Sequence, residues 1–342
     1  MKGASAKFVL VAALLAACGP SKGVISETAG APLRVGIVTV VTGSNDAGYN
    51  ALADLGRLDA ERDLGVRTSL AESNSPDDYA RGIADFAEDG YDLVIAVGVP
   101  LENATWRVAK QFPTVRFAIV DGAPEDDKSG TENLPNVANL LFAENEAGYL
   151  VGVIAATMAH DRVGSAIHDA VCSMGDIAVP RTDRFIAGYQ HAVNAVSPTT
   201  RILNGYSNDL ADPQKATEIG LDHIAQGCDI LFQVAAGNGY TEAAGRKGVY
   251  ALGIDWDRSA STPGTVIASA VKRVDRAVYA TVKDLREGRF KAGDNLFDAS
   301  KDGIGYGTLA PIVPASARAA ADQALADIKS GRIKPKADLQ AR

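Results

Sequence analysis

The sequence predicts an α/β protein of two lobes, each a mainly parallel sheet flanked by helices. Short apolar runs typical of buried strands alternate with helical segments along most of the chain. Such alternation is typical of parallel sheets with right-handed crossovers. The alternation occurs twice, over stretches of about the same size, and a length of 342 residues suits two lobes.

The amino terminus predicts an export signal. The apolar run 8–17 is too short to span a bilayer and has the length of a signal-peptide core. Small residues directly precede Cys18, a pattern typical of lipoprotein signals, so we expect removal of 1–17 and lipid on Cys18. An ordinary signal with a chance cysteine is the alternative. Residues 18–32 predict a flexible tether, which would hold the body at the cell membrane on its periplasmic or extracellular side.

The first array runs from residue 33 to residue 142. We expect strands at 33–41, 66–72, 93–97, 115–120 and 137–142, and helices at 51–64, 77–89 and 104–111. The second of these helices has the clearest ends, because Ser75 can cap it, Pro76 suits its first position and Gly90 can end it.

The second array follows a Gly- and Ala-rich helix at 144–159. We expect strands at 162–167, 200–207, 229–234 and 250–254, helices at 183–196, 212–226 and 243–247, and a loop at 168–182. A turn rich in Ser, Thr, Pro and Gly, a short apolar run at 266–267 and a helix at 271–287 come next. A strand-like piece at 294–299, a helix at 315–329 and a loose tail at 331–342 end the chain.

Composition and motifs exclude several classes of function. The net charge is −8 and no stretch is strongly basic, so nucleic acid is not an expected partner. Four histidines occur without a partner at motif spacing, and the chain has no GxSxG, HExxH, CxxC or P-loop motif. We therefore expect no catalytic residues, no metal site and no cofactor. Cys172 and Cys228 could pair in an oxidising compartment or remain two buried thiols.

Polar and aromatic residues gather where the expected strands end. Asp121 follows the strand 115–120 and Asp255 follows 250–254, the positions at which α/β sheets bind ligands. The set also includes Asn45, Asp46, Tyr49, Asn50, Asn238, Tyr240, Trp256 and Lys272. Aromatic faces can sandwich a flat ring, and one carboxylate can accept from two adjacent hydroxyls, as in a ribose. These residues predict a site for a neutral polar molecule with a flat part.

Several segments between residues 35 and 288 match motifs of a known family. They include NDAGYN at 45–50, FAIVD at 117–121, DILFQVAAGNG at 229–239, GVYALGIDWD at 248–257 and SAVKRVD at 269–275. On these segments the chain resembles the basic membrane protein, or PnrA-like, family of substrate-binding lipoproteins of ABC transporters. The resemblance implies a type I periplasmic-binding-protein-like fold, capture of a small ligand, commonly a purine nucleoside, between two lobes, and delivery to a membrane permease.

The resemblance also implies roles for single residues. It makes Tyr49 a base-stacking residue followed by Asn50, Asp121 a polar contact to the base, and Asp255 and Lys272 contacts to the ribose. The second stacking aromatic maps to Phe232 or its neighbour Gln233, and Gly237 would allow close backbone approach. Asn45, Asp46 and Trp256 complete the expected binding set. The chain departs from the family pattern at Val40, where the family has Asp, and within 45–50 and 168–181.

The resemblance divides the body into lobes. We expect one lobe from 33–142 with 271–288, and the other from 143–270 with 289–330. The chain would cross between them near 142–145, 268–271 and 288–292. We expect a monomer. A ligand sensor that signals to a membrane partner, and a binding protein for a non-nucleoside ligand, remain alternatives; an α/β enzyme lacks any catalytic constellation.

Overall fold

The computed structural model describes residues 31–41, 47–123, 133–210, 212–235 and 237–339. Cys18 and the expected export signal lie outside these residues. The described residues from Leu33 onward form one compact unit. Among the described helices, none combines the length and the apolar character needed to cross a bilayer.

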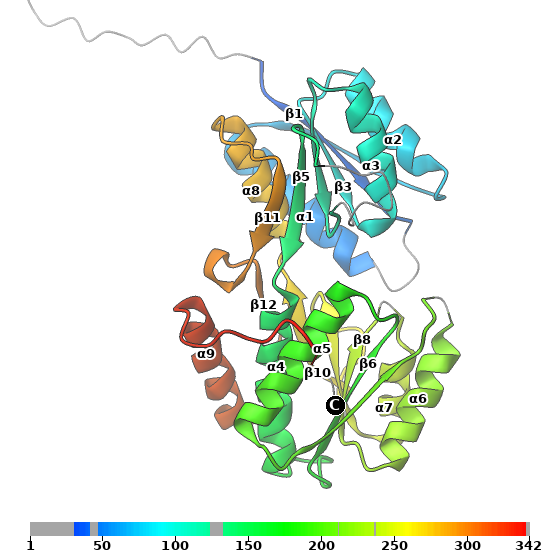
Figure 1. Ribbon diagram of the computed structural model, residues 1–342, viewed down its shortest axis with the longest axis vertical. Helices are drawn as coiled ribbons and strands as arrows, with labels where there is room; N and C mark the ends of the chain where they lie inside the picture. Colours follow the sequence, from blue (N-terminus) through cyan, green and yellow to red (C-terminus); the bar gives the residue numbers. More distant parts are fainter. Residues whose placement is uncertain (1–30, 42–46, 124–132, 211, 236, 340–342) are drawn as a thin grey trace, which may run out of the picture. The chain divides into compact units, whose positions relative to one another are not determined.

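The first sheet has the strand order β11-β5-β4-β3-β1-β2, and all its neighbouring strands are parallel. Its strands are β1 (Arg34–Thr39), β2 (Arg67–Glu72), β3 (Leu93–Val97), β4 (Arg116–Val120), β5 (Val137–Phe142) and β11 (Gly293–Phe297). Helix α1 (Ala47–Leu64) packs against α8 (Val274–Arg286), and α2 (Asp78–Glu88) packs against α3 (Glu102–Gln111). Figure 1 shows α8 on one side of this sheet and α2 and α3 on the other.

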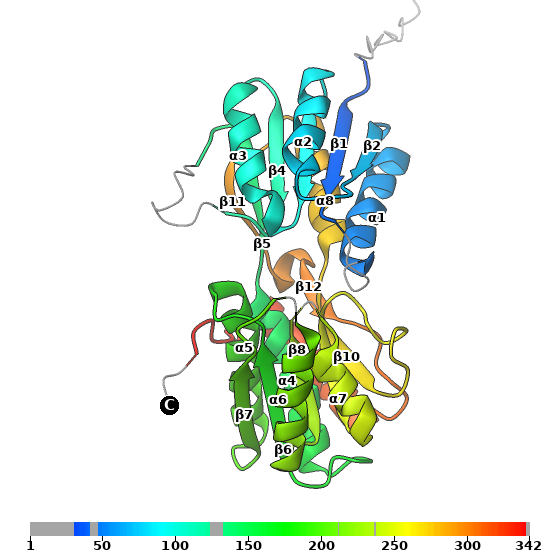
Figure 2. The same ribbon diagram turned by 90° about the vertical axis from the view of Figure 1, so that its right-hand side faces the viewer.

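The second sheet has the order β12-β10-β9-β8-β6-β7, in which β12 is antiparallel to β10 and the other pairs are parallel. Its strands are β6 (Ala170–Gly175), β7 (Arg201–Tyr206), β8 (Ile230–Val234), β9 (Tyr250–Asp255), β10 (Val266–Lys272) and β12 (Ile304–Tyr306). Its helices are α4 (Glu144–His160), α5 (Pro180–Val196), α6 (Pro213–Ala225), α7 (Gly239–Lys247) and α9 (Ala315–Lys329). Helix α4 packs against α5 and α9, and α6 packs against α7, as Figure 2 also shows for α6 and α7. The predicted α/β class with two mainly parallel sheets is confirmed.

One expected strand was placed wrongly. Residues 162–167 form a turn, and the strand β6 (Ala170–Gly175) lies within the stretch expected to be a loop. The turn follows from positive φ angles of 52° at Arg162 and 61° at Gly164, which an extended strand does not adopt. All six residues of β6 are buried. Because both faces of this interior strand are buried, its sequence does not show the alternation of apolar and polar residues that marks a half-exposed strand.

The chain passes between the two sheets three times. It passes after β5 into α4, after β10 into α8, and between β11 and β12. The second passage, expected near 268–271 with a helix from 271, follows Lys272 instead, because 266–272 form β10 of the second sheet and α8 begins at Val274. The third passage differs from the expected position at 288–292, because Gly293–Phe297 pairs with β5 and so belongs to the first sheet. This edge strand alternates between part-buried and exposed residues, which makes its signal weak in the sequence. Lys272 ends one strand at a passage, and Glu144 begins a helix at another.

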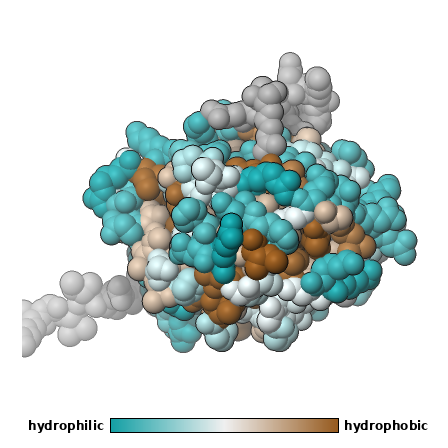
Figure 3. All heavy atoms as spheres, turned by 90° about the horizontal axis from the view of Figure 1, so that it is seen from below, coloured by the Kyte–Doolittle hydropathy of each residue, from teal (hydrophilic) through white to brown (hydrophobic). Residues whose placement is uncertain are grey.

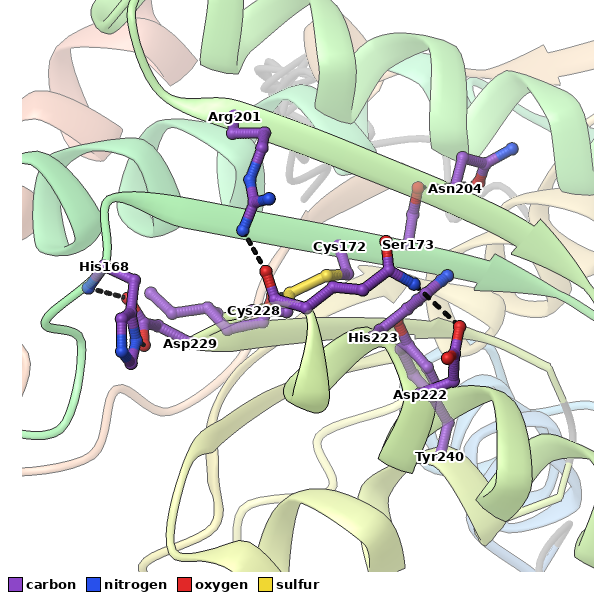
Figure 4. The surroundings of a disulfide bond; sticks show 12 residues. His168, Cys172, Ser173, Arg201, Asn204, Asp222, His223, Cys228, Asp229 and Tyr240 are labelled. Atoms are coloured by element: carbon purple, nitrogen blue, oxygen red, sulfur yellow. Dashed lines mark hydrogen bonds and ion pairs between the residues drawn. A yellow bond between two sulfur atoms is a disulfide. The ribbon is translucent and has the colours of Figure 1, made fainter.

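A disulfide joins Cys172 of β6 to Cys228, which lies just before β8. Both residues are almost fully buried in the core of the second sheet. Figure 4 shows His168 and Asp229 on one side of this bond and His223 and Tyr240 on the other. The disulfide closes a loop with a sequence separation of 56 residues, so it constrains the unfolded chain strongly.

The large exposed apolar side chains of the described residues are spread over several elements. Figure 3 shows one end of the molecule, on which hydrophobic and hydrophilic residues are mixed. Large exposed hydrophobic residues among the described ones are Leu55, Leu58, Ile167, Val196, Leu210, Leu296 and Ile312. Leu55 and Leu58 lie one turn apart on α1, and the other five come from separate helices, strands and loops. Single exposed apolar residues of this kind are normal on soluble protein surfaces.

Candidate ligand-binding site

A cavity of about 280 Å³ is lined by residues from both sheets and their helices. Its apolar lining is Val40, Val41, Tyr49, Tyr79, Val99, Pro100, Phe185, Leu210, Val234 and Ile254. Its polar lining is Asp121, Asp176, Arg181, Thr182, Asp255 and Lys272, together with the backbone of Gly98. A mostly apolar wall with a few convergent polar groups is the usual construction of a small-molecule site.

Two aspartates occupy equivalent positions at the carboxyl ends of the two sheets. Asp121 directly follows β4, and Asp255 is the last residue of β9. Both have positive φ angles, 63° for Asp121 and 67° for Asp255. Asp adopts this left-handed conformation more readily than most residues, and such conformations concentrate at functional sites. The bend at each strand end lets both carboxylates reach the cavity.

Lys272 lies at the centre of three carboxylates. Its ammonium nitrogen is 2.9 Å from Asp121 Oδ2, 3.3 Å from Glu144 Oε1 and 3.6 Å from Asp255 Oδ1. The Lys272 and Glu144 side chains are each only 3% exposed. Glu144 also accepts a hydrogen bond from Arg184 at 3.0 Å. Three carboxylates thus share two cations, so the cluster carries one excess negative charge when all its groups are ionised.

The buried cluster shifts the pKa values of its members. Burial raises the pKa of Glu144 and that of Asp255, although the neighbouring Lys272 partly offsets this effect. Burial by itself would lower the pKa of Lys272. The carboxylates of Asp121, Asp255 and Glu144 together have a larger effect in the opposite direction, so the pKa of the lysine is raised. Lys272 therefore stays charged at neutral pH.

Asp255 is the least satisfied acid of the cluster. Its Oδ1 atom is buried and has no hydrogen-bond partner among the described residues, and its contact with Lys272 at 3.6 Å exceeds hydrogen-bond length. Asp121, by contrast, accepts from the Tyr49 hydroxyl at 2.6 Å and from Lys272 at 2.9 Å. A buried acceptor without a donor is costly, and a ligand hydroxyl could supply that donor.

Three aromatic side chains contribute to the cavity wall from different helices, and one of them is Tyr79 of α2. Tyr49 comes from α1, and Phe185 comes from α5. The centre of the Phe185 ring lies 5.4 Å from the Lys272 ammonium. Phe232 is fully buried and packs behind this wall, 6.3 Å from the Phe185 ring and 4.9 Å from the Tyr189 ring. Phe185, rather than Phe232, thus lines the cavity from the second sheet's side.

The structure brings four of the ten expected binding residues to the cavity: Tyr49, Asp121, Asp255 and Lys272. Four others lie off its lining: Asn50, Phe232, Gly237 and Trp256. Asn50 donates to the Val40 carbonyl at 3.0 Å, and Trp256 lines a smaller neighbouring cavity with Arg258. Asn45 and Asp46 lie outside the described residues.

Sequence reasoning missed Phe185, Asp176, Arg181, Thr182 and Glu144. The first four lie at the start of α5 or just before it, a region expected to be loop followed by an ordinary amphipathic helix. Pro180 was the available signal for where α5 begins, but it did not indicate that these side chains reach a cavity. Glu144 carried no signal, because its partners Lys272 and Arg184 are distant in sequence.

Comparisons with known proteins agree with this geometry. The family of ABC transporter substrate-binding proteins described as PnrA-like matches residues 34–334. The chain belongs to the PnrA-like family. The nucleoside-binding protein BmpA of an ABC transporter from Lactococcus lactis is 26% identical over 90% of this chain and 87% of its own. An uncharacterized lipoprotein of Pyrococcus furiosus is 27% identical over 83% of this chain and 72% of its own.

Solved structures carry the same fold. An ABC transporter solute-binding protein from Aeropyrum pernix superposes with a TM-score of 0.70 at 26% identity, covering 89% of this chain and 93% of that one. As a PnrA-like substrate-binding protein, the chain works with a small ligand and a membrane permease. Homologues named as lipoproteins are consistent with a place outside the cytoplasm at the membrane.

Proposed function

We propose that this PnrA-like protein is the monomeric, lipid-anchored solute-binding component of an ABC importer and that it captures a purine nucleoside. Cys18 would carry the lipid. The cavity would hold the ligand with its sugar toward Asp255 and Lys272 and its base against Tyr49 and Phe185. A nucleoside-binding relative of this family supports the choice of ligand class.

The observation that carries this proposal is the unsatisfied Asp255 carboxylate beside a charged lysine. Asp255 Oδ1 lacks a hydrogen-bond donor among the described residues, while Lys272 lies 3.6 Å away. A vicinal diol offers two donors to a carboxylate and two acceptors to an ammonium group. Because the centre of the Phe185 ring is 5.4 Å from that ammonium group, a flat base attached to the diol could lie over the ring.

The arrangement suggests how binding could reach the permease. Lys272 ends β10 and Glu144 begins α4, so the ion pair between them, 3.3 Å long, joins two of the three passages between the sheets. A ligand that contacts Asp121 and Asp255 together would bind groups of both sheets. Such a ligand stabilises the arrangement in which these groups are close, and the permease would bind that form.

The test is a ligand screen on protein that begins at residue 19 and keeps Leu33–Arg342 intact. Inosine, guanosine and adenosine would be compared with free bases, ribose, arabinose and 2′-deoxynucleosides by thermal denaturation and calorimetry. A ligand at a hundred times its Kd stabilises the protein by about 2.7 kcal/mol. We expect purine nucleosides to do so, and 2′-deoxy analogues to bind at least about tenfold more weakly. Stabilisation by sugars alone, or by no purine nucleoside, would contradict the proposed ligand.

A further inference from the structure

Arg181 is a cation in the cavity wall that local structure does not explain. It lies in the first turn of α5, directly after Pro180, and it lines the cavity. Among the described residues it has no hydrogen bond or ion pair, whereas Arg184 on the next turn pairs with Glu144 at 3.0 Å. A cation near a helix amino terminus opposes the helix dipole. The position therefore offers α5 no stabilisation, and Arg181 has donors available to a ligand.

The helix sets the position of Arg181 relative to the sugar-binding cluster. Arg181 and Phe185 are four residues apart, so they lie on the same face of α5, about one 5.4 Å turn from each other. The Phe185 ring has the Lys272 ammonium 5.4 Å from its centre. A base stacked on Phe185 with its sugar at Lys272 would therefore have the edge away from that sugar near the Arg181 turn.

We propose that Arg181 binds the O6 and N7 acceptors of a 6-oxopurine base, so that the protein prefers inosine- and guanosine-type ligands over adenosine. This inference rests on the proposed function and deepens it. A guanidinium group donates two parallel hydrogen bonds to O6 and N7 of guanine. Adenine places an amino donor where guanine has O6, so it leaves one guanidinium N–H without an acceptor.

Asp176 also favours a 6-oxopurine base. Its carboxylate lines the cavity close to Arg181, because its Oδ1 atom accepts from the Thr182 hydroxyl at 3.3 Å. A 6-oxopurine carries an N1–H donor beside O6, which a carboxylate can accept, whereas adenine has an acceptor at N1.

The experiment compares affinities for inosine, guanosine and adenosine in the unaltered protein, in Arg181→Met and in Arg181→Lys. Calorimetry on protein that begins at residue 19 would give each Kd. We expect the unaltered protein to bind inosine and guanosine at least about tenfold more tightly than adenosine. Arg181→Met should remove most of that preference while adenosine affinity changes less than about threefold. Arg181→Lys keeps the positive charge but cannot donate the two parallel hydrogen bonds of a guanidinium group. It should therefore prefer inosine and guanosine over adenosine little more than Arg181→Met does.

Controls separate this inference from the proposed function. Arg246→Met, on the exposed surface of α7, should change no affinity. The melting temperature of ligand-free Arg181→Met should stay close to that of the unaltered protein, because no partner among the described residues is lost. Failure of all three nucleosides to bind the unaltered protein would overturn the proposed function itself.

Equal binding of adenosine and inosine, or a preference that survives Arg181→Met, would overturn only the role of Arg181. A 5′-monophosphate that binds more tightly than its nucleoside, and loses that advantage in Arg181→Met, would also overturn it. Arg181 would then bind a phosphate rather than a base.

Discussion

Replacing Asp255 by Asn separates the binding role of this carboxylate from its effect on stability. Asn has the same shape and also tolerates the left-handed backbone that Asp255 adopts at φ 67°. The substitution therefore removes a charge without straining the end of β9. Lys272 keeps its contacts with Asp121 at 2.9 Å and Glu144 at 3.3 Å, while the contact that changes is the weaker one at 3.6 Å.

The expected effects on affinity and on stability have opposite signs. Hydrogen bonds to a charged acceptor contribute about 1.5–3 kcal/mol, so nucleoside affinity should fall roughly ten- to a hundredfold. The free energy of unfolding of the ligand-free protein should stay unchanged or rise at neutral pH. Burial raises the pKa of Asp255, so the native state binds its proton more tightly than the unfolded chain, and ionisation lowers stability as pH rises through that pKa. The amide removes this loss and the excess negative charge of the cluster.

Asp121→Asn is the matched comparison, because Asp121 has the same backbone conformation with φ 63° but is fully engaged. It accepts from the Tyr49 hydroxyl at 2.6 Å and from Lys272 at 2.9 Å. Weakening a buried ion pair from one side costs about 3–5 kcal/mol. Urea denaturation of both variants without ligand, with calorimetry for affinity, makes the comparison. If Asp255→Asn destabilises the ligand-free protein as much as Asp121→Asn, the carboxylate at 255 is a structural partner of Lys272 and the reasoning fails.

Three further outcomes follow from the same features. Nucleoside affinity should be constant near neutral pH and fall as pH drops through the raised pKa of Asp255, at a higher pH than for an ordinary aspartate. Asp255→Asn should show no such fall, and Kd measured from pH 8 to about pH 4 tests this. Cys18→Ser should move the protein from the membrane fraction to the soluble fraction of cells, and unchanged fractionation would contradict lipidation. Replacing Cys172 and Cys228 by Ala should lower the free energy of unfolding by about 4 kcal/mol, the chain-entropy value for a separation of 56 residues, with little change in Kd.

Local features of the sequence were sufficient for the fold class and for part of the site. Buried parallel strands are encoded as short apolar runs, so the strands of the first sheet and β7, β8 and β9 of the second could be located without tertiary information. Asp121 and Asp255 could be singled out because ligands bind where parallel strands end. Val249 to Asp255 shows this directly, since its apolar run stops at the acid that lines the cavity.

Packing alone decided which other residues line the cavity. All five residues of β8 are buried, so no alternation in the sequence could show that Phe232 faces the core behind the cavity while Phe185 of α5 forms its wall. The contact between Lys272 and Glu144 joins two passages that are distant in sequence, and neither residue has a local pattern that indicates the other. Arg181 falls in a stretch that the sequence predicts as loop, and only the structure places it in α5 at the cavity wall. The sequence by itself thus determined the strands and the acids at their ends, because burial and chain direction act locally. The tertiary structure decided which rings and charges share one cavity, because those contacts depend on how separate elements pack.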